Sequence, residues 1–305
     1  MTSLPPDNLP VPQVSQPEPF SATSPHSAEP TEAAPEIPPE PDFEIQPLPD
    51  RPPRVDSRTP LRGMDLLYLL LFYFVSGGVI FFLVATGAYI FSGVLPSELK
   101  DTAMTSAPIV IITQALLSAA TLTFLYVMVR GRSAAPFWQT MGWRRFRNMA
   151  SSGSVILRYV LGGFALAVVA GWLGNFVGHE SDMPMEKLMR SPQSVLMLMA
   201  LGTLVAPIVE ETIFRGCIYP VIARKFGITT GIIATGALFG LAHAQQLGFA
   251  WGPVVLIIGV GIVLTYVRAR AGTVAASYFV HLGYNAALFI GFLIATGGLR
   301  HLPTT

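Results

Sequence analysis

The sequence predicts an all-α protein: a polytopic bundle of about 7–8 transmembrane helices that follows a disordered, proline-rich N-terminal tail. Three observations support this fold class. Hydrophobic residues make up 51% of the 305 residues and charged residues only 12%, whereas a soluble domain carries about 25% charged residues. The apolar residues fall into long runs of a length that can cross a bilayer. Polar and charged residues are concentrated before residue 60 and between those runs.

The tail is the first of three expected regions. Residues 1–60 hold 17 of the 26 prolines, with Ser, Thr, Ala and Glu between them. A segment of this composition cannot bury enough apolar surface to offset its ordering entropy, so we expect it to be disordered. It also lacks the basic start and apolar stretch of a signal peptide. The remaining regions are 61–193, with three transmembrane helices, and 194–298, with the helices that carry the polar motifs below.

Seven hydrophobic segments follow the tail. Their expected bounds are 64–95, 106–129, 155–177, 194–223, 228–245, 251–267 and 272–296. The third segment is rich in glycine, which permits close contact between helices. The loop after the second segment holds several arginines, with Trp138 and Trp143 as expected interfacial anchors. The number of passes changes if the long first segment crosses twice or if the fifth is re-entrant.

Basic residues occupy alternate loops. They precede the first segment and recur at 130–147, 224–225 and 268–270. The positive-inside rule therefore places the tail in the cytoplasm, and seven passes would place the C-terminus outside. We expect an integral protein of a bacterial inner (plasma) membrane, in contact with lipid. The net charge of +1 gives no indication of a nucleic-acid partner.

The fourth segment contains ionisable residues within an apolar run. Glu210 and Glu211 are adjacent, and Arg215 follows one helical turn later. Charged groups in a membrane helix are costly, which favours a functional site. The alternative is an internal ion pair between Glu211 and Arg215, at i,i+4, that locks two helices together. Glu210 is rotated about 100° from Glu211 and can point elsewhere. The single cysteine, Cys217, excludes an intrachain disulfide and is expected to be a small packing residue.

Later segments supply polar residues at a similar depth. His243 lies about 17 residues after the turn between the fourth and fifth segments, and the glutamates lie about 15 before it, so each is roughly 23–25 Å from that turn. His281 lies roughly 16 Å along the seventh segment, and Asn285 is one turn deeper. Helix tilt or a kink at Pro207 would account for the remaining difference in depth between His281 and the glutamates. We therefore expect the glutamates, His243, His281 and Asn285 to lie close together.

A glutamate with two histidines can hold or activate a water molecule. One route uses a divalent metal such as zinc, with Glu210, His243 and His281 as ligands. The other needs no metal: Glu210 acts as general base, while His281 and Asn285 stabilise an oxyanion. Both routes are hydrolysis without a covalent intermediate. The sequence contains neither the GxSxG nor the HExxH motif, which argues against an α/β-hydrolase serine site and a zincin site.

The three motifs resemble those of the CPBP family of intramembrane endopeptidases, which includes CAAX prenyl protease 2 and the lysostaphin resistance protein A-like and Abi proteins. The family pattern EExxxR, FxxxH and HxxxN reads here as E-E-T-I-F-R at 210–215, F-G-L-A-H at 239–243 and H-L-G-Y-N at 281–285. The resemblance covers about residues 190–297. It implies six catalytic residues: Glu210, Glu211, Arg215, His243, His281 and Asn285. In this interpretation Glu210 activates water with His243, and the other four assist.

The predicted function is hydrolysis of a peptide bond in a membrane-associated peptide or protein, lipidated or not. The enzyme would be a CAAX-type metalloprotease with one divalent metal, or a glutamate-type hydrolase with none. Two alternatives use the same polar cluster. A proton-coupled transporter would predict inverted repeats, and none is visible in the sequence. A non-catalytic membrane scaffold would keep the cluster as a structural ion-pair network.

Overall fold

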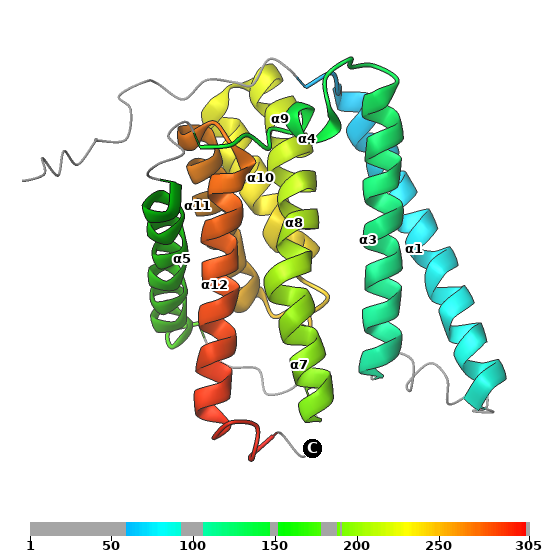
Figure 1. Ribbon diagram of the computed structural model, residues 1–305, viewed down its shortest axis with the longest axis vertical. Coiled ribbons are helices and arrows are strands. Elements are labelled where there is room, and N and C mark those ends of the chain that lie inside the picture. The colour runs from blue at the N-terminus through cyan, green and yellow to red at the C-terminus, as the bar shows by residue number, and fades with distance from the viewer. Residues whose placement is uncertain (1–58, 93–105, 147–151, 178–187, 190, 303–305) are drawn as a thin grey trace, which may run out of the picture. The chain divides into compact units, whose positions relative to one another are not determined.

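The computed structural model describes residues 59–92, 106–146, 152–177, 188–189 and 191–302, so nearly all of the predicted tail lies outside the described residues. Within those ranges the regular elements are all helices, as the fold class predicts (Figure 1). They are α1 (Gly63–Ser92), α3 (Ala107–Arg130), α4 (Phe137–Thr140), α5 (Ser152–Gly174), α7 (Pro192–Ala200), η1 (Leu201–Val205), α8 (Ala206–Glu211), η2 (Thr212–Ile218), α9 (Tyr219–Phe226), α10 (Ile228–Ala242), α11 (Trp251–Ala271) and α12 (Val274–Ala295).

Six of the described helices are long and apolar enough to cross a membrane. They cover Gly63–Phe91, Ala107–Arg130, Gly153–Gly174, Pro192–Phe226, Trp251–Ala271 and Val274–Ala295. The fifth predicted segment, 228–245, is α10, a shorter apolar helix of 15 residues. Its length of about 22 Å is less than the roughly 30 Å of a bilayer's hydrocarbon core. The chain is therefore an integral membrane protein in which α10 forms a short arm of a helical hairpin with α11.

Several basic segments share one end of the bundle. Arg224, at the end of α9, donates hydrogen bonds to the carbonyls of Leu61 and Thr59, the latter at 2.5 Å. Arg132, just after α3, forms an ion pair with Asp65 in the first turn of α1, also at 2.5 Å. These contacts join the start of α1 to the ends of α3 and α9. The structure thus places at one end three of the basic segments that the sequence assigns to one face.

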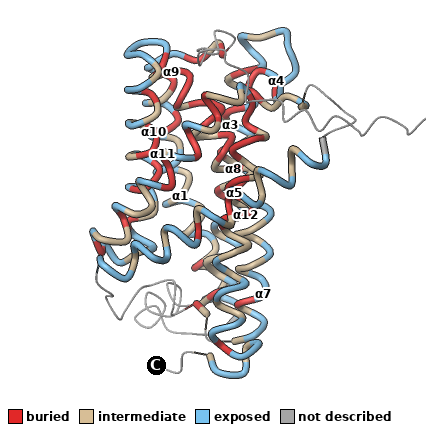
Figure 2. The backbone as a smooth tube through the Cα atoms, turned by 90° about the vertical axis from the view of Figure 1, so that its left-hand side faces the viewer, coloured by how far each residue is buried: buried red, intermediate tan, exposed pale blue. Residues whose placement is uncertain are grey.

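Glycines bring α5 against α12. A Cβ atom on Gly163 would collide with the carbonyl of Val280 and the amide of Tyr284, and one on Gly283 would collide with the backbone of Val160. The small residues of the third segment therefore permit close helix contact, as predicted. Buried positions concentrate around α8, α10 and α11 and toward α9, whereas α7 is mostly partly buried or exposed (Figure 2).

The fourth segment is helical, as predicted, but it is not a regular α-helix throughout. Two π-helical stretches, η1 and η2, interrupt the path from Pro192 to Phe226. Each ends shortly before a proline that lies in the first turn of the next α-helix, Pro207 in α8 and Pro220 in α9. Proline lacks an amide N–H and crowds the preceding turn, so a wider turn at these two places has a local cause. π-helical turns are frequent at functional sites, and η2 begins directly after Glu211.

Candidate active site

The two glutamates of α8 have different environments. Glu211 is fully buried and accepts a hydrogen bond of 2.8 Å from the Nη1 atom of Arg215, which is also fully buried. Arg215 donates further to the carbonyl of Gly261 at 3.0 Å and to the hydroxyl of Thr265 at 3.3 Å, both on α11. The predicted i,i+4 ion pair is therefore present. The further hydrogen bonds of Arg215 help the protein to tolerate this buried pair of charges, while Oε2 of Glu211 is buried without a hydrogen-bond partner among the described residues.

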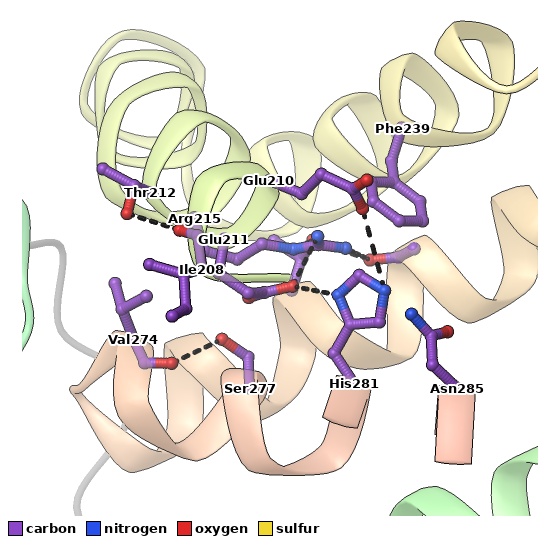
Figure 3. Close-up of polar contacts among 12 residues, drawn as sticks. Ile208, Glu210, Glu211, Thr212, Arg215, Phe239, Val274, Ser277, His281 and Asn285 are labelled. Atoms are coloured by element: carbon purple, nitrogen blue, oxygen red, sulfur yellow. Dashed lines mark hydrogen bonds and ion pairs between the residues drawn. The ribbon is translucent and has the colours of Figure 1, made fainter. Parts of the chain in front are cut away.

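Glu210 points away from this pair and remains partly accessible, with 26% of its side chain exposed. Its Oε2 atom lies 3.7 Å from Nε2 of His281 and 3.9 Å from Nε2 of His243. These separations exceed a direct hydrogen bond. Figure 3 shows the His281 ring with a dashed line to each carboxylate, from Nδ1 to Glu211 and from Nε2 to Glu210. The helices thus converge on Glu210, as predicted from depth.

Both imidazole rings are oriented by an acceptor on their Nδ1 side. His243 follows the last residue of α10, and its Nδ1 lies 2.8 Å from the carbonyl oxygen of Phe239. His281, on α12, has Nδ1 3.1 Å from Oε1 of Glu211. A carbonyl or a carboxylate oxygen only accepts, so each Nδ1 carries a proton. A neutral ring therefore presents an unprotonated Nε2, and both Nε2 atoms lie near Glu210.

Asn285 is already hydrogen-bonded to another helix of the protein. Its Nδ2 atom donates to the carbonyl of Gly202 in η1 at 2.7 Å. An amide nitrogen carries two N–H groups, so one remains for another acceptor. Asn285 thereby connects α12 to η1, the first π-helical stretch. It lies one helical turn after His281 on α12, and Figure 3 shows the two side chains next to each other.

Phe239 forms an apolar wall beside the two histidines. Its ring centroid lies 4.6 Å from that of His243 and 5.7 Å from that of His281. The guanidinium carbon of Arg215 lies 4.4 Å from the same centroid. One aromatic side chain therefore contacts both imidazoles and the buried cation, and it limits the freedom of all three.

Four participants were not foreseen. Thr265 and Gly261 of α11 hold Arg215, and Ser277 of α12 lies beside the Glu211 carboxylate while it donates to the carbonyl of Val274 at 3.1 Å. Ser277 stands one helical turn before His281, a spacing that could have indicated it. Trp143 reaches the site from the loop before α5, a contact that no local pattern indicates.

The donor atoms around Glu210 fit a divalent metal in kind, because two imidazoles with anchored Nδ1 atoms and a carboxylate are common metal ligands. Two ligands of one tetrahedral zinc ion lie roughly 3.4 Å apart, somewhat closer than the separations from Glu210. Among the described residues, no group of three His, Cys, Asp or Glu side chains is arranged to hold a metal ion. The donor chemistry is suitable, but the spacing does not form a ready-made metal site.

Comparison with known protein families agrees with the motifs. Residues 192–287 match the family described as type II CAAX prenyl endopeptidase Rce1-like. Residues 192–287 are thus similar to Rce1-like type II CAAX prenyl endopeptidases, a similarity that is consistent with the CPBP family of intramembrane proteases. The match includes Glu210, His243 and His281 and leaves α1, α3 and α5 outside. No curated protein and no solved structure matches the chain.

Proposed function

We propose that this protein hydrolyses a peptide bond of a membrane-associated peptide or protein at Glu210, without a covalent intermediate. The observation that supports this most strongly is the approach of two oriented Nε2 atoms to within 3.7 and 3.9 Å of the Oε2 atom of Glu210. A water molecule can bridge such a gap with two ordinary hydrogen bonds. The buried Glu211–Arg215 pair lies outside the gap between Glu210 and the two histidines and stabilises the structure around it.

The first step is attack by water on the substrate carbonyl carbon. The water donates one O–H to Glu210 and the other to the unprotonated Nε2 of His243, so a lone pair faces the substrate. Glu210 takes the proton as the carbon–oxygen bond forms. Asn285 and His281 stabilise the resulting oxyanion, Asn285 through its second N–H.

The second step breaks the carbon–nitrogen bond. Protonated Glu210 gives its proton to the leaving amine, which regenerates the carboxylate and releases a carboxylic acid and an amine. If a divalent metal binds, Glu210, His243 and His281 would hold it, and the chemistry supplied there would be Lewis-acid activation of water. No step above depends on it. The six predicted catalytic residues thus keep distinct roles, with Glu210 and His243 on the water.

The substrate class follows from the location of the site. Glu210 lies on α8 and His243 directly follows α10, and both side chains are partly exposed, whereas Glu211, Arg215 and His281 are buried. A peptide must therefore enter at the membrane, so we infer a lipid-anchored or membrane-embedded substrate, including prenylated peptides of the CAAX type.

This function is tested by mapping peptide termini. Wild-type protein and the Glu210→Ala variant, each reconstituted in liposomes, are incubated with a farnesylated CAAX-type peptide and with a membrane-protein extract. Mass spectrometry then identifies the new C-termini. We expect termini that only the wild-type protein generates. Identical products from both proteins, or none from either, would contradict the proposal and favour the transporter or scaffold alternatives.

A further inference from the structure

One contact from outside the matched region reaches the turn that carries the two glutamates. The indole Nε1 of Trp143 donates a hydrogen bond of 3.0 Å to the hydroxyl of Thr212. That hydroxyl donates in turn to the carbonyl of Ile208 at 2.7 Å (Figure 3). Thr212 is fully buried and directly follows Glu211. The chain of two hydrogen bonds therefore closes across the backbone segment that contains Glu210 and Glu211.

The same indole ring also contacts the helix that bears a histidine of the site. Its centroid lies 5.5 Å from that of Tyr278 on α12. Tyr278 precedes His281 by three residues, so the two side chains share one face of the helix. Trp143 thus contacts the elements of both Glu210 and His281, whose nearest atoms are 3.7 Å apart.

The residues on both sides of Trp143 are hydrogen-bonded to the start of α12. The carbonyl of Gly142 accepts a 2.9 Å hydrogen bond from the amide of Val274, at the start of α12. The amide of Arg144 donates to the hydroxyl of Thr273 at 3.1 Å, and that hydroxyl donates to the carbonyl of Arg144 at 2.8 Å. A backbone held in this way can hold the indole at a fixed distance from Thr212.

We propose that Trp143 is a positioning residue for the hydrolysis, setting the spacing between Glu210 and His281 through Thr212 and Tyr278. This inference rests on the proposed function. The indole touches neither the substrate nor the reacting atoms. Its N–H restrains the junction of α8 with the π-helical η2, where a wider turn otherwise leaves the carboxylates less constrained.

The test compares turnover of wild-type protein with that of three variants in liposomes. The reporter is a quenched-fluorescent peptide that spans a cleavage site mapped as above. Trp143→Phe removes the donor and keeps an aromatic ring, Thr212→Val removes the hydroxyl at constant shape, and Thr212→Ser retains it. We expect kcat to fall about 5- to 10-fold in Trp143→Phe, the effect of losing one buried hydrogen bond, and at least as much in Thr212→Val, which loses both hydrogen bonds of the hydroxyl. KM should stay within about two-fold, and Thr212→Ser should keep nearly full activity.

Two further variants make the result specific. The double variant Trp143→Phe/Thr212→Val should be no slower than Thr212→Val alone, because Thr212→Val already removes the hydrogen bond that Trp143→Phe removes. Trp138→Phe is the matched control: Trp138 lies in α4, and its ring contacts Trp143 edge-on but is 47% exposed, so its kcat should equal that of the wild type. Thermal unfolding of every variant checks that the fold is retained.

Either of two outcomes would overturn the inference. One is an unchanged kcat in both Trp143→Phe and Thr212→Val, and the other is an equal loss of kcat in Thr212→Val and Thr212→Ser. If Trp143→Phe does not fold, the comparison of Val with Ser at position 212 decides alone. Failure of the proposed function is distinguishable, since it requires that Glu210→Ala cleave as the wild type does, or that neither cleaves.

Discussion

At the scale of single residues, adjacent carboxylates in one helix do different work because their surroundings differ. Glu211 is neutralised by Arg215 and by the Nδ1–H of His281, and it is inaccessible. Glu210 is partly exposed, and the Nε2 atoms of His243 and His281 lie close to its Oε2 atom. The Glu211 carboxylate stabilises the fold, and the Glu210 carboxylate is available for chemistry. Substitutions at the two positions should therefore affect different measurements.

The first prediction concerns the buried ion pair. Arg215→Met leaves the Glu211 carboxylate buried without its compensating charge, which typically costs about 3–5 kcal/mol. We expect a large fall in the thermal unfolding temperature in detergent, or loss of folded protein. Glu210→Gln, which removes a partly exposed charge one residue away, is the matched control and should unfold near the wild-type temperature. Equal stability of Arg215→Met and wild type would contradict the role assigned to the pair.

The second prediction concerns the water. Since Glu210 and His243 are sufficient to orient it in the proposed steps, incubation with a chelator should leave the cleavage rate within about two-fold of the untreated enzyme. The measurement is the rate of peptide cleavage before and after chelation, together with the metal content of the protein. Loss of activity that zinc restores would instead place a metal ion between Glu210, His243 and His281.

At the scale of helices, local spacing was sufficient to predict some contacts and insufficient for others. The Glu211–Arg215 pair follows from the i,i+4 spacing, and the approach of His243 follows from counting residues on either side of one turn. The π-helical turns could not be read from periodicity, because apolar residues surround them on every face. Their neighbours Pro207 and Pro220 were the available signal. In retrospect, a second proline in the fourth segment indicated a second interruption.

Trp143 illustrates the other limit of the sequence. An aromatic residue beside arginines indicates an interfacial anchor, and Trp138, nearly half exposed, remains compatible with that prediction. Trp143 instead donates to Thr212, which is 69 positions away in sequence. A contact of that separation depends on how the loop folds back over the helices, and no composition or spacing rule gives it.

The third prediction tests the packing of α5 on α12. Gly163→Ala places a Cβ atom against the backbone of α12, and overpacking of this kind costs about 1–3 kcal/mol. Gly162→Ala is the matched control, because a Cβ atom there meets nothing within 4 Å. We expect a lower unfolding temperature for Gly163→Ala only, since alanine otherwise improves helix propensity by about 1 kcal/mol. Equal unfolding temperatures would contradict the close contact.

At the scale of the whole molecule, the arrangement of basic segments gives a testable orientation. The positive-inside rule places the end with Arg132 and Arg224 in the cytoplasm. Native Cys217 is buried, with 1% exposure, so the wild-type protein should react little with a thiol reagent. In intact cells, a membrane-impermeant maleimide should label His301→Cys, beyond α12, and should not label Ala135→Cys, beyond α3. The reverse pattern would contradict the predicted orientation.

The proposal that Glu210 performs hydrolysis is tested most directly by steady-state kinetics on one mapped peptide. Wild type, Glu210→Gln and His243→Ala are compared after each is shown to unfold at a similar temperature. We predict that kcat falls by about 100-fold or more in Glu210→Gln, as expected when a general base is lost, while KM changes by less than about two-fold. A Glu210→Gln protein that cleaves the peptide at the wild-type rate would contradict the proposal.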